Sequence, residues 1–268
     1  MTKRIAAIVF ILFCTSLAWM ILGGTIVART DDFSARLKGR VTTTWGTPQV
    51  QSPPQATYSR TTMEMVERTI DGKKISERAS RTVEHVIPLD GSDIQVALRL
   101  EHRQKGLLWY STYTVDYSGK YRYLNSSNQE EHVSIRFKFP AERAIYDDFR
   151  VLVDGKPVPA RTGANGAIVG VHMAAAQSVE YAVSYRSQGL QSWTYRFGSD
   201  VNQIRNFSLQ MQTDFDAIDF PDNTLSPTEK ESIRGGWLRF LIAMSVEVYL
   251  RVFWVKIFHK PPPPSNRA

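Results

Sequence analysis

The most uneven feature of the hydrophobic pattern is a long apolar stretch near the start of the sequence. Residues 5–28 (IAAIVFILFCTSLAWMILGGTIVA) contain no charged side chain, whereas charged residues recur throughout the following two hundred residues or so. At the helical rise of about 1.5 Å per residue this stretch reaches about 36 Å, enough to cross the hydrocarbon core of a bilayer with some tilt. The pattern therefore predicts an N-terminal transmembrane helix.

The charges flanking this stretch predict its orientation. Lys3 and Arg4 precede it, and Arg29, Asp31 and Asp32 follow it with mixed sign. Because a short cationic flank stays in the cytoplasm, we expect a cytoplasmic N-terminus and a periplasmic location for the bulk of the chain. A cleaved signal peptide is the alternative, but its apolar region is normally about 7–15 residues long and is followed by a small-x-small cleavage site, which is not evident here. We expect an anchor in the inner, cytoplasmic membrane.

From about residue 61 the sequence changes to short segments of alternating polarity. The clearest is residues 133–139 (VSIRFKF), whose apolar residues share one face while Ser134, Arg136 and Lys138 share the other. Ser118-Gly119 and Asp154-Gly155 have the composition of hairpin turns, and residues 141–148 have the pattern of a short helix. Further strands are predicted at residues 82–87, 94–100, 107–117, 121–124, 149–158, 179–185, 192–197 and 207–213. This texture predicts a mainly β protein with an antiparallel, sandwich-like domain.

The segment that follows the predicted strands is apolar again but carries charges. Residues 237–258 include Arg239, Glu247, Arg251 and Lys256. A charge at the centre of a membrane span costs about 2.5–3.5 kcal/mol on the insertion scale, so this segment is a poor lone span. We expect a C-terminal apolar helix that either crosses the membrane or lies on it.

Taken together, these patterns divide the chain into five segments. We expect an anchor at 1–29, a polar helix extension and proline-rich linker at 30–60, an extracytoplasmic β domain at 61–215, an acidic exit loop at 216–236, and a membrane-associated helix with a disordered tail at 237–268.

Composition excludes several classes of protein. The single cysteine, Cys14, lies inside the predicted anchor, so the external domain has neither disulfides nor thiol chemistry. The net charge is +7, but the basic residues are scattered, so we expect no nucleic-acid partner. The expected partners are the lipid bilayer and other envelope proteins.

The candidate acid–base and metal residues do not form a recognisable catalytic pattern. Neighbours in a strand point to opposite faces, so no glutamate serves the histidine beside it. The sequence pairs tested in this way are Glu84-His85, Glu101-His102 and Glu131-His132. The acidic segment lacks the glycine and the final glutamate of a calcium loop. Its aspartates are Asp214, Asp216, Asp219 and Asp222. We therefore predict no catalytic, cofactor-binding or metal-binding residues, no cofactor and no enzymatic activity.

Aromatic residues at strand spacing have two interpretations. They can pack across strands in the core, which is the commoner role, or line a groove for a peptide or glycan. The residues concerned are Trp109, Tyr110, Tyr113, Tyr117, Tyr121 and Tyr123.

Three stretches, in this order, resemble the inner-membrane CreD family, whose members are associated with colicin tolerance and envelope stress. They are the W-G-x-P-Q turn at residues 45–49, GLQSWTYRFG at 189–198, and FSLQMQTDFDAIDFPDNTLSPTE at 207–229, followed by Gly236-Trp237. The resemblance implies an anchored β-rich external domain and offers no catalytic residues. Family-like members continue into a bundle of further membrane helices. The resemblance therefore leads to the hypothesis of a shortened member whose last thirty residues are out of frame.

Two functional hypotheses follow. The favoured one is a non-enzymatic inner-membrane protein that acts through interactions in envelope maintenance or stress tolerance, as the resemblance implies. The alternative is a membrane-tethered binding or sensor module that recognises a peptide or glycan.

Overall fold

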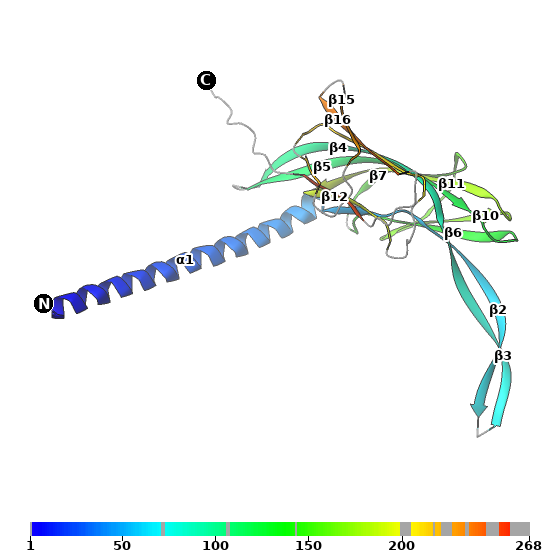
Figure 1. The fold of residues 1–268 in the computed structure, drawn as a ribbon, viewed down its shortest axis with the longest axis horizontal. Coiled ribbons are helices and arrows are strands. Elements are labelled where there is room, and N and C mark those ends of the chain that lie inside the picture. Colours follow the sequence, from blue (N-terminus) through cyan, green and yellow to red (C-terminus); the bar gives the residue numbers. More distant parts are fainter. Residues whose placement is uncertain are drawn as a thin grey trace. The chain divides into compact units, whose positions relative to one another are not determined.

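The computed structural model describes residues 2–70, 73–105, 108–142, 144–198, 205–216, 218–220, 227–233, 236–244 and 252–257. The chain forms two compact units, Met1–Trp45 and Gly46–Ala268. The described part of the first unit is a single helix, and the regular elements described in the second are all strands (Figure 1). The prediction of a mainly β chain with one N-terminal apolar helix is confirmed.

Helix α1 (Thr2–Trp45) contains the apolar stretch. Its segment Lys3–Thr30 has a mean hydropathy of 2.6 and is the one helix in the described part of the chain that is long and apolar enough to cross a membrane. Thr15 and Thr25 satisfy their hydroxyls within the helix, because they donate to the carbonyls of Ile11 and Leu22 at 2.9 and 2.8 Å. The segment thus has the length and surface of a membrane span or a signal sequence.

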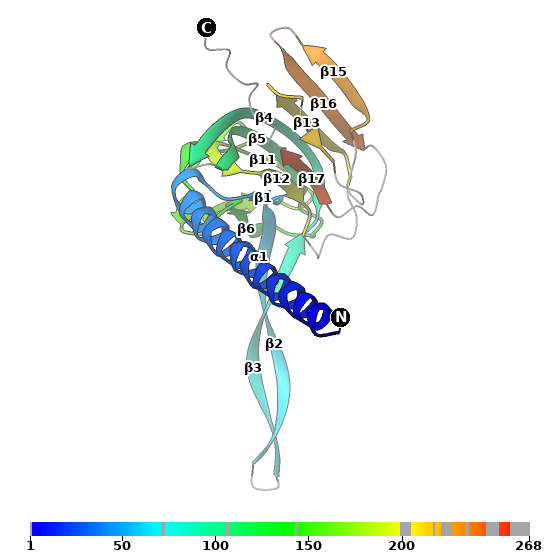
Figure 2. The same ribbon diagram turned by 90° about the vertical axis from the view of Figure 1, so that its left-hand side faces the viewer.

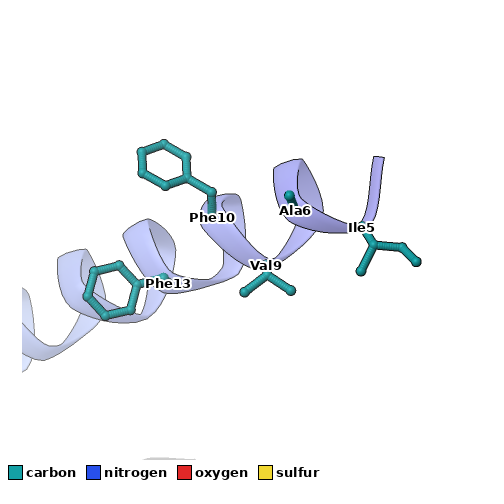
Figure 3. Close-up of a pocket in the computed structure, with 5 residues that line it drawn as sticks. All are labelled: Ile5, Ala6, Val9, Phe10 and Phe13. Atoms are coloured by element: carbon teal, nitrogen blue, oxygen red, sulfur yellow. The ribbon is translucent and has the colours of Figure 1, made fainter. Parts of the chain in front are cut away.

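The apolar side chains of residues 5–27 that the structure describes are largely exposed. Figure 3 shows a shallow apolar depression between Ile5, Val9, Phe10 and Phe13, all from the same helix. Lipid is a suitable environment for such a surface, whereas a binding cavity would need walls from other elements.

The largest sheet of the second unit has eight strands and is antiparallel apart from the parallel pair β13 and β4. Its strands, in spatial order, are β15 (Glu229–Ile233), β16 (Trp237–Met244), β13 (Phe207–Thr213), β4 (Leu89–Lys105), β5 (Leu108–Leu124), β11 (Ser178–Leu190), β7 (Tyr146–Val153) and β8 (Lys156–Pro157).

The second sheet has five strands and continues into a two-stranded ribbon. β6 pairs with β2 only from Gln55 to Tyr58, and beyond that point β2 and β3 run on together (Figures 1 and 2). The strands, in spatial order, are β3 (Lys73–Ile87), β2 (Gln55–Ile70), β6 (Glu131–Lys138), β10 (Gly166–Met173) and β9 (Arg161–Gly163).

A third, four-stranded sheet joins segments that lie far apart in the sequence. Its strands are β1 (Gln49–Gln51), β12 (Ser192–Arg196), β17 (Val252–Ile257) and β14 (Ile218–Asp219). β1 runs parallel to β12, with Gln49 opposite Trp193 and Gln51 opposite Tyr195. All three stretches that resemble the CreD family contribute a strand or its flank to this sheet.

The apolar faces of these sheets contribute to one buried cluster. Ile94, Val96 and Leu98 enter it from β4, and Val133, Ile135 and Phe137 enter it from β6. The predicted alternation of VSIRFKF is thus confirmed, since Arg136 and Lys138 lie on the exposed face. The cluster is also rich in tyrosine, and the ring of Tyr117 stacks on that of Tyr185.

The predicted C-terminal helix is wrong, because the described parts of residues 237–258 are strands. β16 pairs with β13 and buries Phe240 and Ile242, which alternate with more exposed residues. Arg239 meets Glu231 of β15, with Nη1 and Oε2 3.3 Å apart. This cross-strand pair accounts for a charge within an apolar run. Glu247 and Arg251 lie outside the described residues.

Two further local predictions need correction, and a third is confirmed. Ser118-Gly119 is not a turn but lies within β5, where Gly119 leaves room for the Tyr117 hydroxyl, because a Cβ at Gly119 would lie 2.8 Å from that oxygen. The described part of residues 141–148 is not helical, because β7 begins at Tyr146 and the Tyr146 hydroxyl bonds both backbone groups of Ala141. The Asp154-Gly155 turn is confirmed, with φ values of 51° and 75°.

The expected linker and exit loop also contain strands. β1 and the start of β2 fall within 30–60. β1 is held in the fold by Gln49 and Gln51, whose side chains are fully buried and hydrogen-bonded. β14 and β15 fall within 216–236. The helix extension from residue 31 to Trp45 is present as the second part of α1.

Candidate binding groove

The histidine and glutamate neighbours point away from each other, as expected for a strand. Glu131 is buried and pairs with Arg60, whereas the exposed His132 faces His172 of β10. The hydrogen bond from Arg60 lowers the pKa of Glu131 and raises that of the guanidinium. His85 stacks on Tyr58, with ring centroids 5.1 Å apart.

Asp214, the first aspartate of the acidic segment, bonds the backbone of a neighbouring strand. Asp214 Oδ1 accepts a hydrogen bond from the Leu100 N–H at 2.9 Å. Asp222 lies outside the described residues. In the described part of the chain, no group of three or more His, Cys, Asp or Glu side chains has the geometry of a metal site.

Four of the six aromatic residues are core residues rather than the lining of an aromatic groove. Tyr113, Tyr117, Tyr121 and Tyr123 are at most 2% exposed. The Tyr121 hydroxyl lies between those of Tyr117 and Tyr195, in a buried network of phenols. Burial raises the pKa of Tyr121 to about 12, although the hydrogen bonds from its neighbours act in the opposite direction. Tyr110 is also buried, and Trp109 is half-buried.

One concave surface of the second unit is a groove where strands of different sheets begin and end. Its volume is about 790 Å³. Its wall is mostly apolar, with proline, valine and leucine side chains from the β1–β2 and β3–β4 connections and from the end of β5. The residues lining it are Ser52, Pro53, Pro54, Gln55, Val86, Ile87, Pro88, Leu89, Asp90, Tyr123, Leu124, Ser126, Arg136, Lys138, Gly198 and Arg205.

Hydrogen bonds fix the chain segments that form the groove. The Tyr123 hydroxyl donates to the Pro54 carbonyl at 2.5 Å, which ties the β1–β2 connection to β5. The side chain of Asn206 donates to the Asp90 carbonyl at 3.1 Å, next to Arg205. The groove walls are therefore preformed by backbone contacts.

The groove carries an excess of positive charge. Arg136, Lys138 and Arg205 line it, against the single carboxylate of Asp90. Arg136 and Lys138 are exposed on the outer face of β6, two residues apart, and neither forms an ion pair with another described residue. An apolar wall beside the exposed cations of β6 suits a ligand that is both anionic and partly apolar.

The sequence predicts which residues of β6 share a polar face, but it does not indicate that they line a groove. The alternation of residues 133–139 places Arg136 and Lys138 on one polar face. Nothing local links them to Arg205 or to Pro53 and Pro54, because only the sheet topology brings these segments together.

The W-G-x-P-Q turn has a structural role. Gln49 donates through Nε2 to Ser187 Oγ and to the Gln188 carbonyl, and Gln51 Oε1 accepts from the Tyr185 hydroxyl at 2.8 Å. Gly46 has a φ of +102°, and a Cβ there would lie 2.7 Å from the Gln188 carbonyl oxygen. This part of the resemblance thus concerns packing between β1 and its neighbours rather than ligand binding.

No protein-family model and no curated protein matches the chain. Among solved structures, a protein from Legionella pneumophila described as a candidate nutrient-binding protein is similar over 63% of this chain and 69% of its own, with 11% identity and a TM-score of 0.41. An M1 zinc metallopeptidase from Deinococcus radiodurans is similar over 63% of this chain, with 10% identity and a TM-score of 0.38. The chain spans 42% of the peptidase's length. Similarity at this level identifies neither a family nor an activity.

Proposed function

We propose that this protein is a non-enzymatic, membrane-tethered binding module whose groove holds an extended acidic segment of a polypeptide. The observation that carries this proposal is the pairing of an apolar wall with Arg136, Lys138 and Arg205. Carboxylates of the ligand would face these cations, and intervening apolar side chains would pack on Pro53 and Pro54.

A peptide suits this groove better than a glycan. Tyr123 is the one aromatic side chain among the described lining residues, and it is 1% exposed with its hydroxyl bonded to Pro54. It therefore offers no ring face on which a sugar could stack. The proline, valine and leucine side chains provide apolar contact area for peptide side chains instead.

We place the protein in the inner membrane, with its N-terminus in the cytoplasm and its β domain in the periplasm. The apolar segment of α1 and its flanking charges support this location. The CreD-like stretches, which meet in one four-stranded sheet, support a role in envelope maintenance or stress tolerance. The groove would then engage another envelope protein.

Peptide binding tests the groove. The full chain in nonionic detergent would be titrated into fluorescein-labelled decapeptides that alternate leucine with aspartate, serine or lysine, and fluorescence anisotropy would be followed. We expect the aspartate peptide to bind about tenfold more tightly than the serine peptide, and the lysine peptide not to bind. Arg136→Glu and Lys138→Glu should each weaken binding about tenfold, whereas Arg150→Glu, on the exposed face of β7, should not.

Several outcomes would reject the proposed ligand. Binding that ignores the charge of the peptide would show that only apolar contacts matter. If Arg150→Glu weakened peptide binding as much as Arg136→Glu or Lys138→Glu, the effect of charge would be diffuse rather than local to the groove. Added salt would then weaken binding to all three variants alike. Binding of envelope oligosaccharides in place of the acidic peptide would identify the groove as a glycan site.

The location is tested by reporter fusions after Asn165, an exposed residue of the β9–β10 turn, and after Ala268. β16 and β17 pair with strands of the external domain, so we expect a periplasmic signal at both positions. A cytoplasmic signal at Asn165 would overturn the orientation. A cytoplasmic signal at Ala268 alone would require a second crossing of the membrane.

A further inference from the structure

Two histidines face each other on the outer surface of the five-stranded sheet. His132 of β6 is directly opposite His172 of β10 in the antiparallel register, so both side chains emerge on the same face. His132 Nδ1 and His172 Nε2 are 3.3 Å apart, and the rings are tilted by 55° rather than stacked. Both residues are exposed, and neither belongs to the groove.

The separation of the two nitrogens matches that of two ligands of one metal ion. At 3.3 Å the two nitrogens are within reach of one N–H···N hydrogen bond in the metal-free chain. Two nitrogens bound at about 2.0–2.1 Å to one tetrahedral ion lie about 3.3–3.4 Å apart, which follows from the tetrahedral angle. The observed 3.3 Å equals the separation that one tetrahedral ion requires of its two nitrogen ligands.

Neighbouring residues leave space for one ring and place a carboxylate beside the other. Glu130 Oε1 lies 3.6 Å from His172 Nδ1, the ring nitrogen that does not face His132. Metal-binding histidines commonly give their second N–H to a carboxylate, and Glu130 lies just beyond hydrogen-bond distance on the side of His172 where such a carboxylate would be needed. The His132 ring lies over Gly170, where a Cβ would come within 3.1 Å of it.

We propose that His132 and His172 bind one divalent transition-metal ion of the imidazole-preferring class, Zn²⁺, Ni²⁺ or Cu²⁺. Glu130 is the carboxylate beside the second ring nitrogen of His172. Since the described residues offer no third ligand at the site, water or a group from a binding partner completes the coordination. The ion would link β6 to β10, so that part of its binding free energy stabilises the fold.

The test is metal titration of the full chain, purified in detergent without a histidine tag. Isothermal titration with Zn²⁺ should give one ion per chain. His132→Gln and His172→Gln should each raise the Kd for Zn²⁺ at least about tenfold, and Glu130→Gln should raise it by a smaller factor. His102→Gln is the matched control, because His102 is an exposed strand histidine of β4 and should leave the Kd unchanged.

A second readout separates metal binding from a structural role. The paramagnetic resonance spectrum of the Cu²⁺-loaded chain should show two nitrogen ligands, and one in either histidine variant. If the pair is only a hydrogen bond, His172→Gln lowers the melting temperature without changing any metal parameter. Unchanged Zn²⁺ affinity in His172→Gln, or no binding at millimolar Zn²⁺, would overturn the site.

Discussion

Raising the pH should unfold the β domain through its buried phenols. Seven tyrosines of the core are at most 3% exposed and have pKa values raised by burial. In the unfolded chain these groups ionise near pH 10. They are Tyr113, Tyr117, Tyr121, Tyr123, Tyr181, Tyr185 and Tyr195.

The sign and size of this effect follow from proton linkage. Because the folded chain retains protons that the unfolded chain releases, stability is fully present below about pH 10 and declines as the pH rises. For Tyr121, with a folded pKa of about 12, the loss at pH 11 is about 1.4 kcal/mol. If all seven phenols stay protonated in the folded chain at pH 11, the free energy of unfolding falls by about 10 kcal/mol in total. This loss is comparable to the whole stability of a typical domain.

Tyrosinate absorbance and far-ultraviolet circular dichroism, recorded together during an alkaline titration, measure this loss. We expect at least seven of the eleven tyrosines to ionise only as the sheet signal disappears. Tyr181→Phe is the matched variant, because the buried Tyr181 hydroxyl has no hydrogen-bond partner among the described residues. It should be at least as stable at neutral pH and about 1.4 kcal/mol more stable than the parent at pH 11. Full ionisation near pH 10 with the sheet signal intact would refute the reasoning.

Two further substitutions test the packing and the buried ion pair. Gly189→Ala should destabilise the domain by about 3 kcal/mol in chemical denaturation, because a Cβ at this position would lie 2.3 Å from the Tyr113 ring. Gly163→Ala, with open space around it, should change little, and equal effects would contradict the packing argument. Glu131→Gln should flatten the acid limb of the stability profile, since the lowered pKa of Glu131 gives stability above its unfolded pKa of about 4.3 that is lost as the pH falls. An unchanged acid limb would contradict the role of the Arg60 pair.

Local patterns predicted the strands whose two faces meet different environments. VSIRFKF has a buried face and a solvent face, so its alternation follows the pleat closely. The C-terminal segment was misjudged because length and hydrophobicity do not separate a membrane helix from buried strands. Its charges were the available signal, since Arg239 has a cross-strand partner in Glu231. Ser118-Gly119 was misjudged because a glycine beside tyrosines can serve packing as well as turning.

The groove and the histidine pair were beyond local prediction for one physical reason. Side-chain alternation indicates which residues share the face of a strand, but it does not indicate which strand is adjacent. His132 forms a pair because β6 lies beside β10, which carries His172 forty residues later. Arg136 becomes part of the groove because the fold brings it near Pro53, Pro54 and Arg205. Pairing between distant strands therefore creates both sites, and substitutions that shift the register of β6 should disrupt the metal site and the cationic face of the groove together.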